Sequence, residues 1–543
     1  MAARERNEGL LCDLVQARAG ALPDLEVLTF ESNDSGCPGA ADEVRTYSEL
    51  ARNGNAVAAW LVERGMQRGE RFGLMLRNHP EFVETMTAAS QSACVSVPID
   101  PRTRGDKLAY TLRDAGCRGV VCADYCVESV EKIRDQCPGI EWILLLESGE
   151  GDSLPIAADI EDATSFAEVL GQDRPVLDVR LQSDRDPLQI IYTSGTTGDP
   201  KGVVFSNERF AGFAFLGPML GYNESDRPYT GLSLTHGNAQ AVTLGPSLFM
   251  GLRGVFSRRF TKSRLWSVCR RLGCTTFSLL GGMATAIYAE PEHGDDADNP
   301  VRMVISAGMP AAIWESFEKR FGVDLFEWYG AIEGGLAFKP LGEGPVGSFG
   351  RPAPGLEMKI VDERGEVCPP GVPGEIVSRP EGATAEVEYY GNEKASAAKV
   401  EGGWLRSGDI GHTDEEGWMF FDYRKGGGIR HNGDFINPGF VEKAVAEYPQ
   451  VSDVFVYGVK AESGSPGEKD VVAVVVPTDG LGGVDGFNAP GLFAFCREKL
   501  EANFVPTWLQ LVEEIPKTAS EKPQERFLLE RFAPGAPNIH KGG

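Results

Sequence analysis

The segment that decides the fold follows a short apolar run, residues 188–191, and has the sequence Tyr192-Thr193-Ser194-Gly195-Thr196-Thr197-Gly198-Asp199-Pro200-Lys201-Gly202. Glycines let the backbone N–H groups of such a loop approach an anion and form a concave nest of donors. The hydroxyls add rotatable donors, and Lys201 adds a point charge for phosphate oxygens. The spacing G-x-x-x-x-G-K-[ST] of P-loop nucleotidases is absent. The segment therefore predicts a polyphosphate-binding loop, the alternative being a flexible surface loop rich in glycine and threonine.

Helices and strands alternate upstream of this loop. Apolar spacing predicts a helix that ends near Arg64 with Ser48 as its N-cap, and a second helix over residues 80–92. Short apolar runs predict strands over 72–76, 94–99 and 189–193. Repeated βα units favour an α/β fold with a largely parallel sheet, in which ligands lie beyond the carboxyl ends of the strands.

The composition of the second half of the chain changes at two places. Short strands over 303–305 and 325–328 are followed by a region rich in glycine and proline, 340–380, which predicts a small β-barrel-like part. A glycine run within residues 424–428 predicts a flexible hinge. The pattern predicts a large N-terminal domain of layered α/β subdomains, 1–423, a smaller mobile α+β domain, 429–532, and a poorly ordered tail, 533–543.

Composition restricts the class of protein. A chain of 543 residues exceeds one hydrophobic core, so two or more domains are expected. The net charge of −26 argues against nucleic acid and anionic membranes as partners. No apolar run approaches the ~20 residues that span a bilayer, and no secretory signal is visible, so a cytoplasmic protein is expected. The 11 cysteines lack a C-x-x-C pair and favour free thiols in a reducing compartment.

The loop and four later motifs occur in a family-like order. The later motifs are Tyr329-Gly330-Ala331-Ile332-Glu333, Arg406-Ser407-Gly408-Asp409-Ile410-Gly411, Asp422-Tyr423-Arg424 and Pro516-Lys517-Thr518-Ala519-Ser520-Glu521-Lys522. Together they resemble the motifs of the adenylate-forming superfamily, which includes acyl-CoA synthetases, peptide-synthetase adenylation domains and firefly luciferase. The resemblance covers roughly residues 45–530 and is greatest for carnitine/crotonobetaine-type acid–CoA ligases.

The resemblance implies a nucleotide site for ATP and AMP. It places the ring of Tyr329 against adenine, Gly308 in the adenine-side loop, Asp409 on both ribose hydroxyls and Arg424 on ribose or phosphate. It assigns Mg²⁺ to Glu333, in agreement with the preference of that ion for hard oxygen ligands. The phosphates then fall to the loop residues Thr193, Ser194, Gly195, Thr196, Thr197, Gly198 and Lys201.

The resemblance also implies the chemistry. Lys522 matches the catalytic lysine that bridges carboxylate and α-phosphate oxygens as charge builds on phosphorus, and Glu333 is the second catalytic residue. Gly433 matches the loop that lines the coenzyme A tunnel once the small domain has rotated, and His236 matches the acyl pocket. The implied reaction is AMP-forming acyl-CoA synthesis from a small-molecule carboxylic acid, ATP with Mg²⁺, and coenzyme A.

Three positions depart from the family pattern. Ile332 replaces a threonine and cannot donate to the α-phosphate, Gly426 replaces the hinge residue, and Glu521 replaces a glycine beside Lys522. Three alternatives therefore stay open: an adenylation enzyme that loads a carrier protein's phosphopantetheine in trans, a luciferase-like oxygenase, and a nucleotide-binding descendant without catalysis. The sequence leaves the acid and the oligomeric state open.

Overall fold

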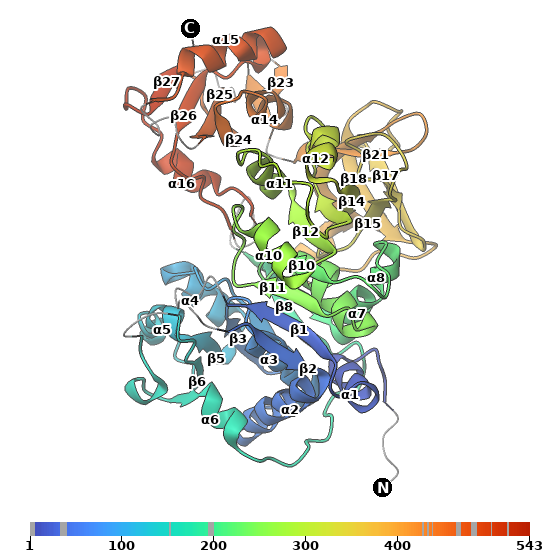
Figure 1. The fold of residues 1–543 in the computed structure, drawn as a ribbon, viewed down its shortest axis with the longest axis vertical. Coiled ribbons are helices and arrows are strands. Elements are labelled where there is room, and N and C mark those ends of the chain that lie inside the picture. The colour runs from blue at the N-terminus through green and yellow to red at the C-terminus, as the bar shows by residue number, and fades with distance from the viewer. Residues whose placement is uncertain are drawn as a thin grey trace. The chain divides into compact units, whose positions relative to one another are not determined.

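The computed structural model describes residues 6–32, 41–150, 154–193, 200–425, 428–431, 434–436, 438–462, 469–478, 486–500, 502–518 and 521–542. The chain divides into two compact units. Unit 1 comprises Met1–Thr261, Val268–Ser278 and Val387–Ala398, and unit 2 comprises Lys262–Ser267, Leu279–Glu386 and Lys399–Gly543. One of the breaks between the units falls inside strand β12 (Thr276–Leu280), which is labelled in Figure 1.

Unit 1 contains a seven-stranded sheet in the order β7–β6–β5–β3–β4–β8–β9. All pairs are parallel except β8 with β9. In chain order the strands are β3 (Arg71–Met75), β4 (Val95–Pro98), β5 (Cys117–Ala123), β6 (Trp142–Leu146), β7 (Ala163–Ser165), β8 (Pro187–Thr193) and β9 (Lys201–Ser206). The central strands are almost wholly buried, as parallel strands covered by helices must be. The expected α/β architecture is confirmed.

The helices that accompany this sheet include α2 (Tyr47–Glu63), α3 (Pro80–Ser92), α4 (Gly105–Asp114), α5 (Asp124–Glu131) and α6 (Phe166–Gly171). The expected N-cap of α2, Ser48, is wrong by two residues. Thr46 caps the helix, because its side chain accepts the backbone N–H of Glu49 at 3.2 Å while the Glu49 carboxylate accepts that of Thr46 at 2.8 Å. This reciprocal pair is a capping box. Gly54 of α2 lies so close to Thr87 of α3 that a Cβ atom there would come within 2.8 Å of it.

Unit 1 also holds the strand order β10–β11–β1–β2. These strands are β1 (Glu26–Glu31), β2 (Glu43–Thr46), β10 (Pro228–Thr230) and β11 (Gly254–Ser257), with only β1 and β2 antiparallel. The π-helix η3 (Ala239–Leu244) follows β10. The remaining helices up to α13 are α1 (Leu11–Ala21), α7 (Asn207–Ala214), α8 (Leu216–Met219), α9 (Gly245–Met250), α10 (Leu265–Leu272), α11 (Gly281–Tyr288), α12 (Trp314–Phe321) and α13 (Glu393–Lys399).

Unit 2 contains the strands that carry most of the later motifs. Strand β13 (Met303–Ala307) is parallel to β14 (Asp324–Gly330), and β15 (Leu336–Lys339) and β16 (Arg351–Pro352) continue antiparallel. The expected β region is an antiparallel sheet, β17–β18–β20–β19, with β21 also paired to β20. Its strands are β17 (Leu356–Val361), β18 (Gly374–Pro380), β19 (Val400–Glu401), β20 (Trp404–Thr413) and β21 (Met419–Arg424).

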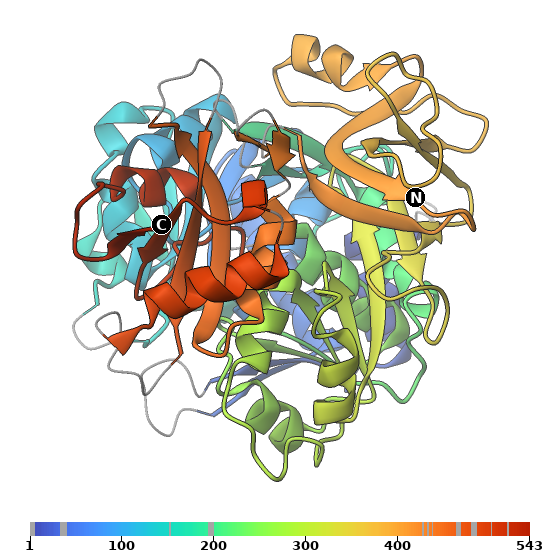
Figure 2. The same cartoon turned by 90° about the horizontal axis from the view of Figure 1, so that it is seen from above.

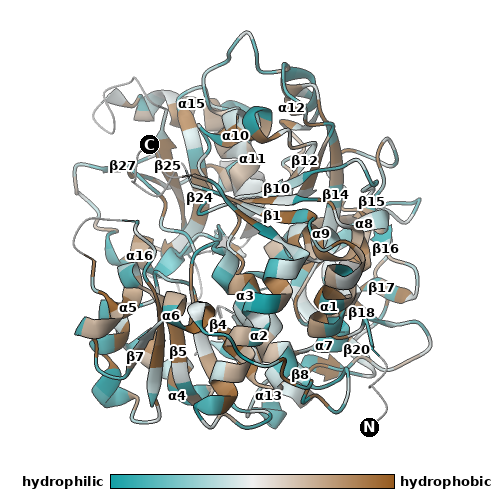
Figure 3. Cartoon of the chain, turned by 60° about the horizontal axis from the view of Figure 1, so that its bottom comes forward, coloured by the Kyte–Doolittle hydropathy of each residue, from teal (hydrophilic) through white to brown (hydrophobic). Residues whose placement is uncertain are grey.

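The C-terminal part of unit 2 is α+β, as expected. Its sheet has the order β24 (Val451–Lys460), β25 (Lys469–Pro477), β26 (Trp508–Leu511) and β27 (Ile539–Lys541). Alternate residues of β25 enter two different apolar clusters, and its middle is coloured hydrophobic in Figure 3. Helix α15 (Ala489–Lys499) lies across these strands in Figure 2. The other elements are β22 (Ile429–His431), β23 (Asp434–Ile436), α14 (Pro438–Ala446) and α16 (Glu525–Glu530).

The expectation of a poorly ordered tail is wrong for residues 533–542. Strand β27 pairs with β26, and Ile539 is buried against the same cluster as Trp508. In the described part of the chain, no helix has the length and apolarity needed to cross a membrane. The cysteines described there are all buried free thiols.

Candidate active site

Asp409 lies at an irregularity of strand β20 that a glycine makes possible. The pairing register between β18 and β20 shifts beside it, and the preceding Gly408 has a φ of +80°, in the left-handed region. Ser407 fixes this bulge, since its Oγ donates to the Ile376 carbonyl at 2.6 Å and accepts the backbone N–H of Asp409 at 2.9 Å. The bulge sets the direction of the Asp409 side chain.

The Asp409 carboxylate is buried and incompletely paired. Tyr329 Oη donates to Asp409 Oδ2 at 2.6 Å, and Arg424, directly opposite on β21, places NH1 3.2 Å from Oδ1. Among the described residues, Oδ1 has no hydrogen-bond partner. Burial, together with the charge of Asp409, raises the pKa of Tyr329 well above its usual value, so the phenol stays a donor. Oδ1 is therefore ion-paired with Arg424 but still able to accept hydrogen bonds, which suits a diol ligand.

Lys522 is electrostatically coupled to Glu333, Asp409 and Arg424. Thr518 N donates to Lys522 O at 2.8 Å, and Glu521, directly before Lys522, has a φ of +57°. The residue is exposed, yet desolvation by surrounding protein lowers the pKa of its ammonium, and Arg424 lowers it further, against the opposing charges of Asp409 and Glu333. Unit 2 therefore brings these four charged residues together.

Gly308 lies on a loop held by a buried acid that sequence reasoning missed. Gly308, with a φ of +93°, and Met309 donate their backbone N–H groups to Glu327 Oε1 at 2.5 and 3.2 Å. Burial raises the pKa of Glu327 to about 8. A Cβ atom on Gly281 would stand 2.2 Å from the Gly308 carbonyl oxygen, so two backbones meet here. The sequence signal that could have identified Glu327 is a carboxylate within the otherwise apolar middle of β14.

The predicted phosphate-loop residues lie in unit 1. Ser194, Gly195, Thr196, Thr197 and Gly198 lie outside the described residues. The flanking strands β8 and β9 form a hairpin in which Thr193 is opposite Lys201, and Thr193 Oγ1 donates to the Lys201 carbonyl at 3.4 Å. Lys201 is exposed, with Nζ 5.5 Å from the centre of the Tyr389 ring. The two ends of the loop are therefore adjacent.

His236 is half-buried in the turn that precedes the π-helix η3. Its Nδ1 accepts the backbone N–H of Asn238 at 3.3 Å, which assigns the ring proton of the neutral form to Nε2. Insertions of π-helix are frequent at functional sites. Gly433 and Gly426 lie outside the described residues.

The backbone conformation explains why two glycines, Gly334 and Gly335, follow Glu333. Gly334 and Gly335 have φ values of +147° and +85°, and Gly334 N donates to the Ala331 carbonyl at 3.1 Å. Residues with a side chain rarely adopt these φ values, so the turn itself requires glycine. Ile332 lies half-buried in the same turn.

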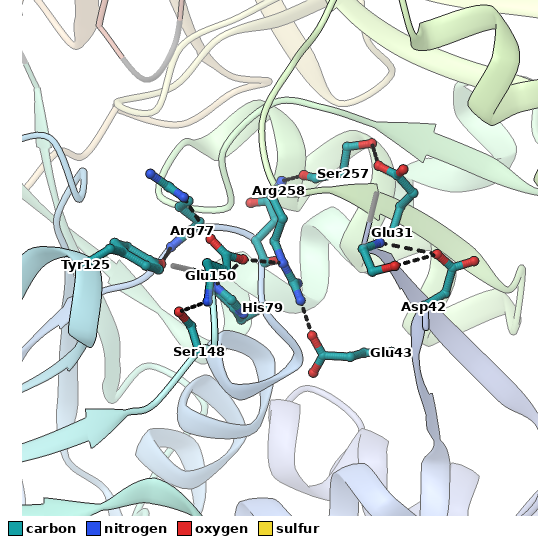
Figure 4. Close-up of polar contacts among 12 residues, drawn as sticks. Glu31, Asp42, Glu43, Arg77, His79, Tyr125, Ser148, Glu150, Ser257 and Arg258 are labelled. Carbon is teal, nitrogen blue, oxygen red and sulfur yellow. Dashed lines mark hydrogen bonds and ion pairs between the residues drawn. The ribbon is translucent and has the colours of Figure 1, made fainter. Parts of the chain in front are cut away.

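A second polar network, also missed from the sequence, lies in unit 1 (Figure 4). Glu150 accepts from Arg77 NH1 at 2.7 Å, and its other oxygen lies 2.9 Å from Arg258 Nε and 3.4 Å from His79 Nε2. Burial, reinforced by the two arginines, lowers the pKa of His79 well below its usual value, so this histidine is neutral. The residues follow β3, β6 and β11, so the network joins loops at the carboxyl ends of these strands.

Glu375 and Lys399 also escaped the sequence motifs. Glu375 Oε1 accepts the Gly408 N–H at 3.1 Å, and its other oxygen is ion-paired with Arg406 at 3.0 Å. Lys399 Nζ donates to the Ser407 carbonyl at 3.1 Å. Both support the bulge at Asp409, and neither belongs to a motif whose spacing reveals it.

The residues fit a nucleotide with a metal carried on its phosphates. The Asp409 oxygen that accepts no hydrogen bond from the described residues fits a ribose hydroxyl, and Glu333 offers a hard oxygen ligand. No group of three or more potential metal-ligating side chains occurs within the described ranges. Magnesium would then be held by Glu333 together with phosphate and water oxygens.

Comparison with known proteins decides the family. The model of the AMP-binding enzyme family matches residues 15–386, and that of the AMP-binding enzyme C-terminal domain matches residues 441–522. The chain belongs to the AMP-binding enzyme family. The chain is 30% identical to the medium/long-chain-fatty-acid–CoA ligase FadD17 of Mycobacterium marinum, over 93% of this chain and 95% of that protein.

Further CoA ligases are similar to this chain in sequence or in structure. A crotonobetaine/carnitine–CoA ligase of Salmonella choleraesuis is 27% identical, over 93% of this chain and 96% of the ligase. The structure of the anthranilate CoA ligase AuaEII in complex with anthranoyl-AMP superposes with a TM-score of 0.82 at 24% identity, covering 96% of both chains. A benzoate CoA ligase from Burkholderia xenovorans LB400 gives 0.78 at 22% identity, covering 96% of this chain and 99% of the other. The predicted superfamily and fold are thus confirmed.

Proposed function

We propose that this enzyme is an AMP-forming acid–CoA ligase, which activates a carboxylic acid as an acyl adenylate with release of pyrophosphate and then transfers the acyl group to coenzyme A. The observation that carries the proposal is the cluster in unit 2. Buried Asp409 is held by Tyr329 and Arg424, keeps one oxygen without a hydrogen bond from the described residues, and shares its electrostatic surroundings with Glu333 and Lys522. The family and the CoA-ligase relatives support the same chemistry.

Within this proposal each residue has one task. Asp409 accepts hydrogen bonds from the ribose hydroxyls, the Tyr329 ring lies against adenine, and Arg424 contacts ribose or phosphate. Lys522 offers its ammonium to the α-phosphate as the acid's oxygen attacks, because a cation aimed at developing charge lowers the barrier most. When bound through Glu333, Mg²⁺ neutralises phosphate charge and orients the pyrophosphate leaving group.

The remaining assignments rest on the motifs. We assign Thr193, the loop 194–198 and Lys201 to the phosphates, Gly308 to the adenine side, His236 to the acyl pocket and Gly433 to coenzyme A. We further propose that a domain of residues 429–532 turns about residues 424–428, relative to residues 1–423, between the two half-reactions. Such motion lets one site serve both steps.

The proposal is tested by pyrophosphate release from MgATP with a panel of carboxylic acids, with and without coenzyme A. The panel covers short, branched, medium- and long-chain, aromatic, carnitine-like and steroid side-chain acids. Acid-dependent pyrophosphate together with a thioester supports the ligase and identifies the substrate class. Pyrophosphate without thioester favours a carrier protein as acceptor, and nucleotide binding without any release favours a non-catalytic descendant.

A further inference from the structure

Lys399 is a basic residue beside Asp409 that lies outside all the family-like motifs. It ends helix α13 and is half-buried. Its Nζ donates to the Ser407 carbonyl at 3.1 Å, and Ser407 in turn accepts the Asp409 backbone N–H. The ammonium is therefore held at the bulge that directs Asp409.

The charges around Lys399 are those of the candidate nucleotide site. Its ammonium is electrostatically coupled to the carboxylates of Glu333, Asp409 and Glu375 and to the guanidinium of Arg424. All of these except Glu375 are also coupled to Lys522. Glu333 marks the metal end of the proposed nucleotide, and Asp409 marks the ribose end. The Ser407 carbonyl holds the Lys399 ammonium at the Asp409 bulge, within electrostatic reach of Glu333. Between these two ends of the proposed nucleotide, the α-phosphate joins the ribose.

Electrostatic balance favours an anion at this position. Arg406 and Lys425 are both ion-paired with Glu375, at 3.0 and 3.3 Å. The remaining cations are Lys399, Lys522 and Arg424. They are balanced by the carboxylates of Asp409 and Glu333 alone, which leaves an excess of positive charge. Desolvation by the surrounding protein lowers the pKa of Lys399. Its ammonium is thus short of water, and phosphate oxygens are the natural replacement.

We propose that Lys399 binds the α-phosphate of adenosine phosphates and is a second specificity-determining cation of this site, beside Lys522. This role rests on the proposed function, since it takes Glu333 and Asp409 as ligands of the nucleotide. A lysine that only fixes the Ser407 bulge would instead act on the ribose contact, and the two roles differ in what they do to adenosine and to AMP.

The test compares dissociation constants for adenosine, AMP and MgATP in the full-length protein and in Lys399→Met, Lys399→Gln and Lys399→Arg variants. Lys394→Met, an exposed lysine of the same helix, is the matched control. We expect AMP to bind about 10-fold more weakly to the Met and Gln variants, with adenosine unchanged, recovery in the Arg variant and no effect in the control. Thermal midpoints verify that the variants are folded, and the Gln variant serves if the Met variant is not.

Two results would overturn this role. Equal weakening of adenosine and AMP would make Lys399 a structural support of the bulge, and unchanged AMP binding would remove it from the phosphate altogether. Failure of the unsubstituted protein to bind AMP and ATP is a distinct result, since it would reject the proposed function itself and Lys399's role along with it.

Discussion

The ribose assignment of Asp409 yields a prediction that compares two nucleotides in two proteins. Asp409→Asn keeps the size of the side chain but removes its charge and one acceptor oxygen. The remaining amide oxygen is the natural acceptor for Tyr329, which donates at 2.6 Å in the unsubstituted protein. In the unsubstituted protein, Oδ1 is the oxygen that accepts no hydrogen bond from the described residues. The substitution replaces this oxygen with an amide NH₂, so a ribose hydroxyl loses its acceptor.

The magnitude follows from that single contact. A hydrogen bond to a charged group contributes about 1.5–3 kcal/mol, so the unsubstituted protein should bind ATP roughly 10- to 100-fold more tightly than 2′-deoxy-ATP. In Asp409→Asn we expect this ratio to fall below about 3, since a contact already lost cannot be lost again. Calorimetry measures the dissociation constants of ATP and 2′-deoxy-ATP for both proteins. The ratio of the two constants within one protein is insensitive to overall destabilisation of that protein.

The matched control is Glu415→Gln, which removes one negative charge from the exposed turn between β20 and β21. Its ATP to 2′-deoxy-ATP ratio should equal that of the unsubstituted protein. If Asp409→Asn also keeps the original ratio while remaining folded, Asp409 does not hold the ribose, and Oδ1 is not the acceptor of a ribose hydroxyl.

Three further predictions concern residues around this site. Lys522→Ala should reduce acid-dependent pyrophosphate release by ~10²-fold or more while the dissociation constant of ATP changes less than about threefold; parallel loss of binding and turnover would contradict a role in the chemical step. Glu521→Gly should raise the thermal midpoint by the equivalent of up to about 1 kcal/mol, because Glu521 has a φ of +57°, and an unchanged or lower midpoint would show that no net cost is stored there. Because burial raises the pKa of Glu327 to about 8, its stabilising protonated form is fully present below pH 4.5 and lost as pH rises through about 8. The thermal midpoint of Glu327→Gln relative to the unsubstituted protein should therefore rise between pH 5 and pH 9, whereas a constant difference would refute the shift.

The sequence predicted the elements with strong periodicity and missed those decided by distant contacts. Helix α3 spans Pro80–Ser92 as expected. The tail was misjudged from its glycine and proline content, because its order depends on pairing between β27 and β26, a contact that composition does not reveal. The α2 cap was misplaced because Ser48 and Thr46 are both good caps, and only the Thr46–Glu49 spacing closes a capping box.

The candidate site divides in the same way. Tyr329, Asp409, Arg424 and Lys522 were predicted from motifs, and unit 2 holds them within one charged cluster. Lys399 was missed because its link to the site runs through a backbone carbonyl on a β-bulge, and no side-chain pattern encodes such a contact. Supporting residues are thus harder to infer from one sequence than the groups that meet the ligand.

The departures from the family pattern weigh less against catalysis than the sequence alone suggested. Glu521 keeps the left-handed backbone that a glycine would supply, so the turn that precedes Lys522 retains its shape despite the substitution. Asp409 Oδ1 is ion-paired with Arg424 but accepts no hydrogen bond from the described residues, and a buried carboxylate oxygen is more stable once its hydrogen-bonding capacity is filled. The arrangement around Asp409 thus makes physical sense as a site whose last partner is a ligand. Because Lys522 is electrostatically coupled to the same carboxylate, a ligand of Asp409 lies near a cation suited to the chemistry of its phosphate.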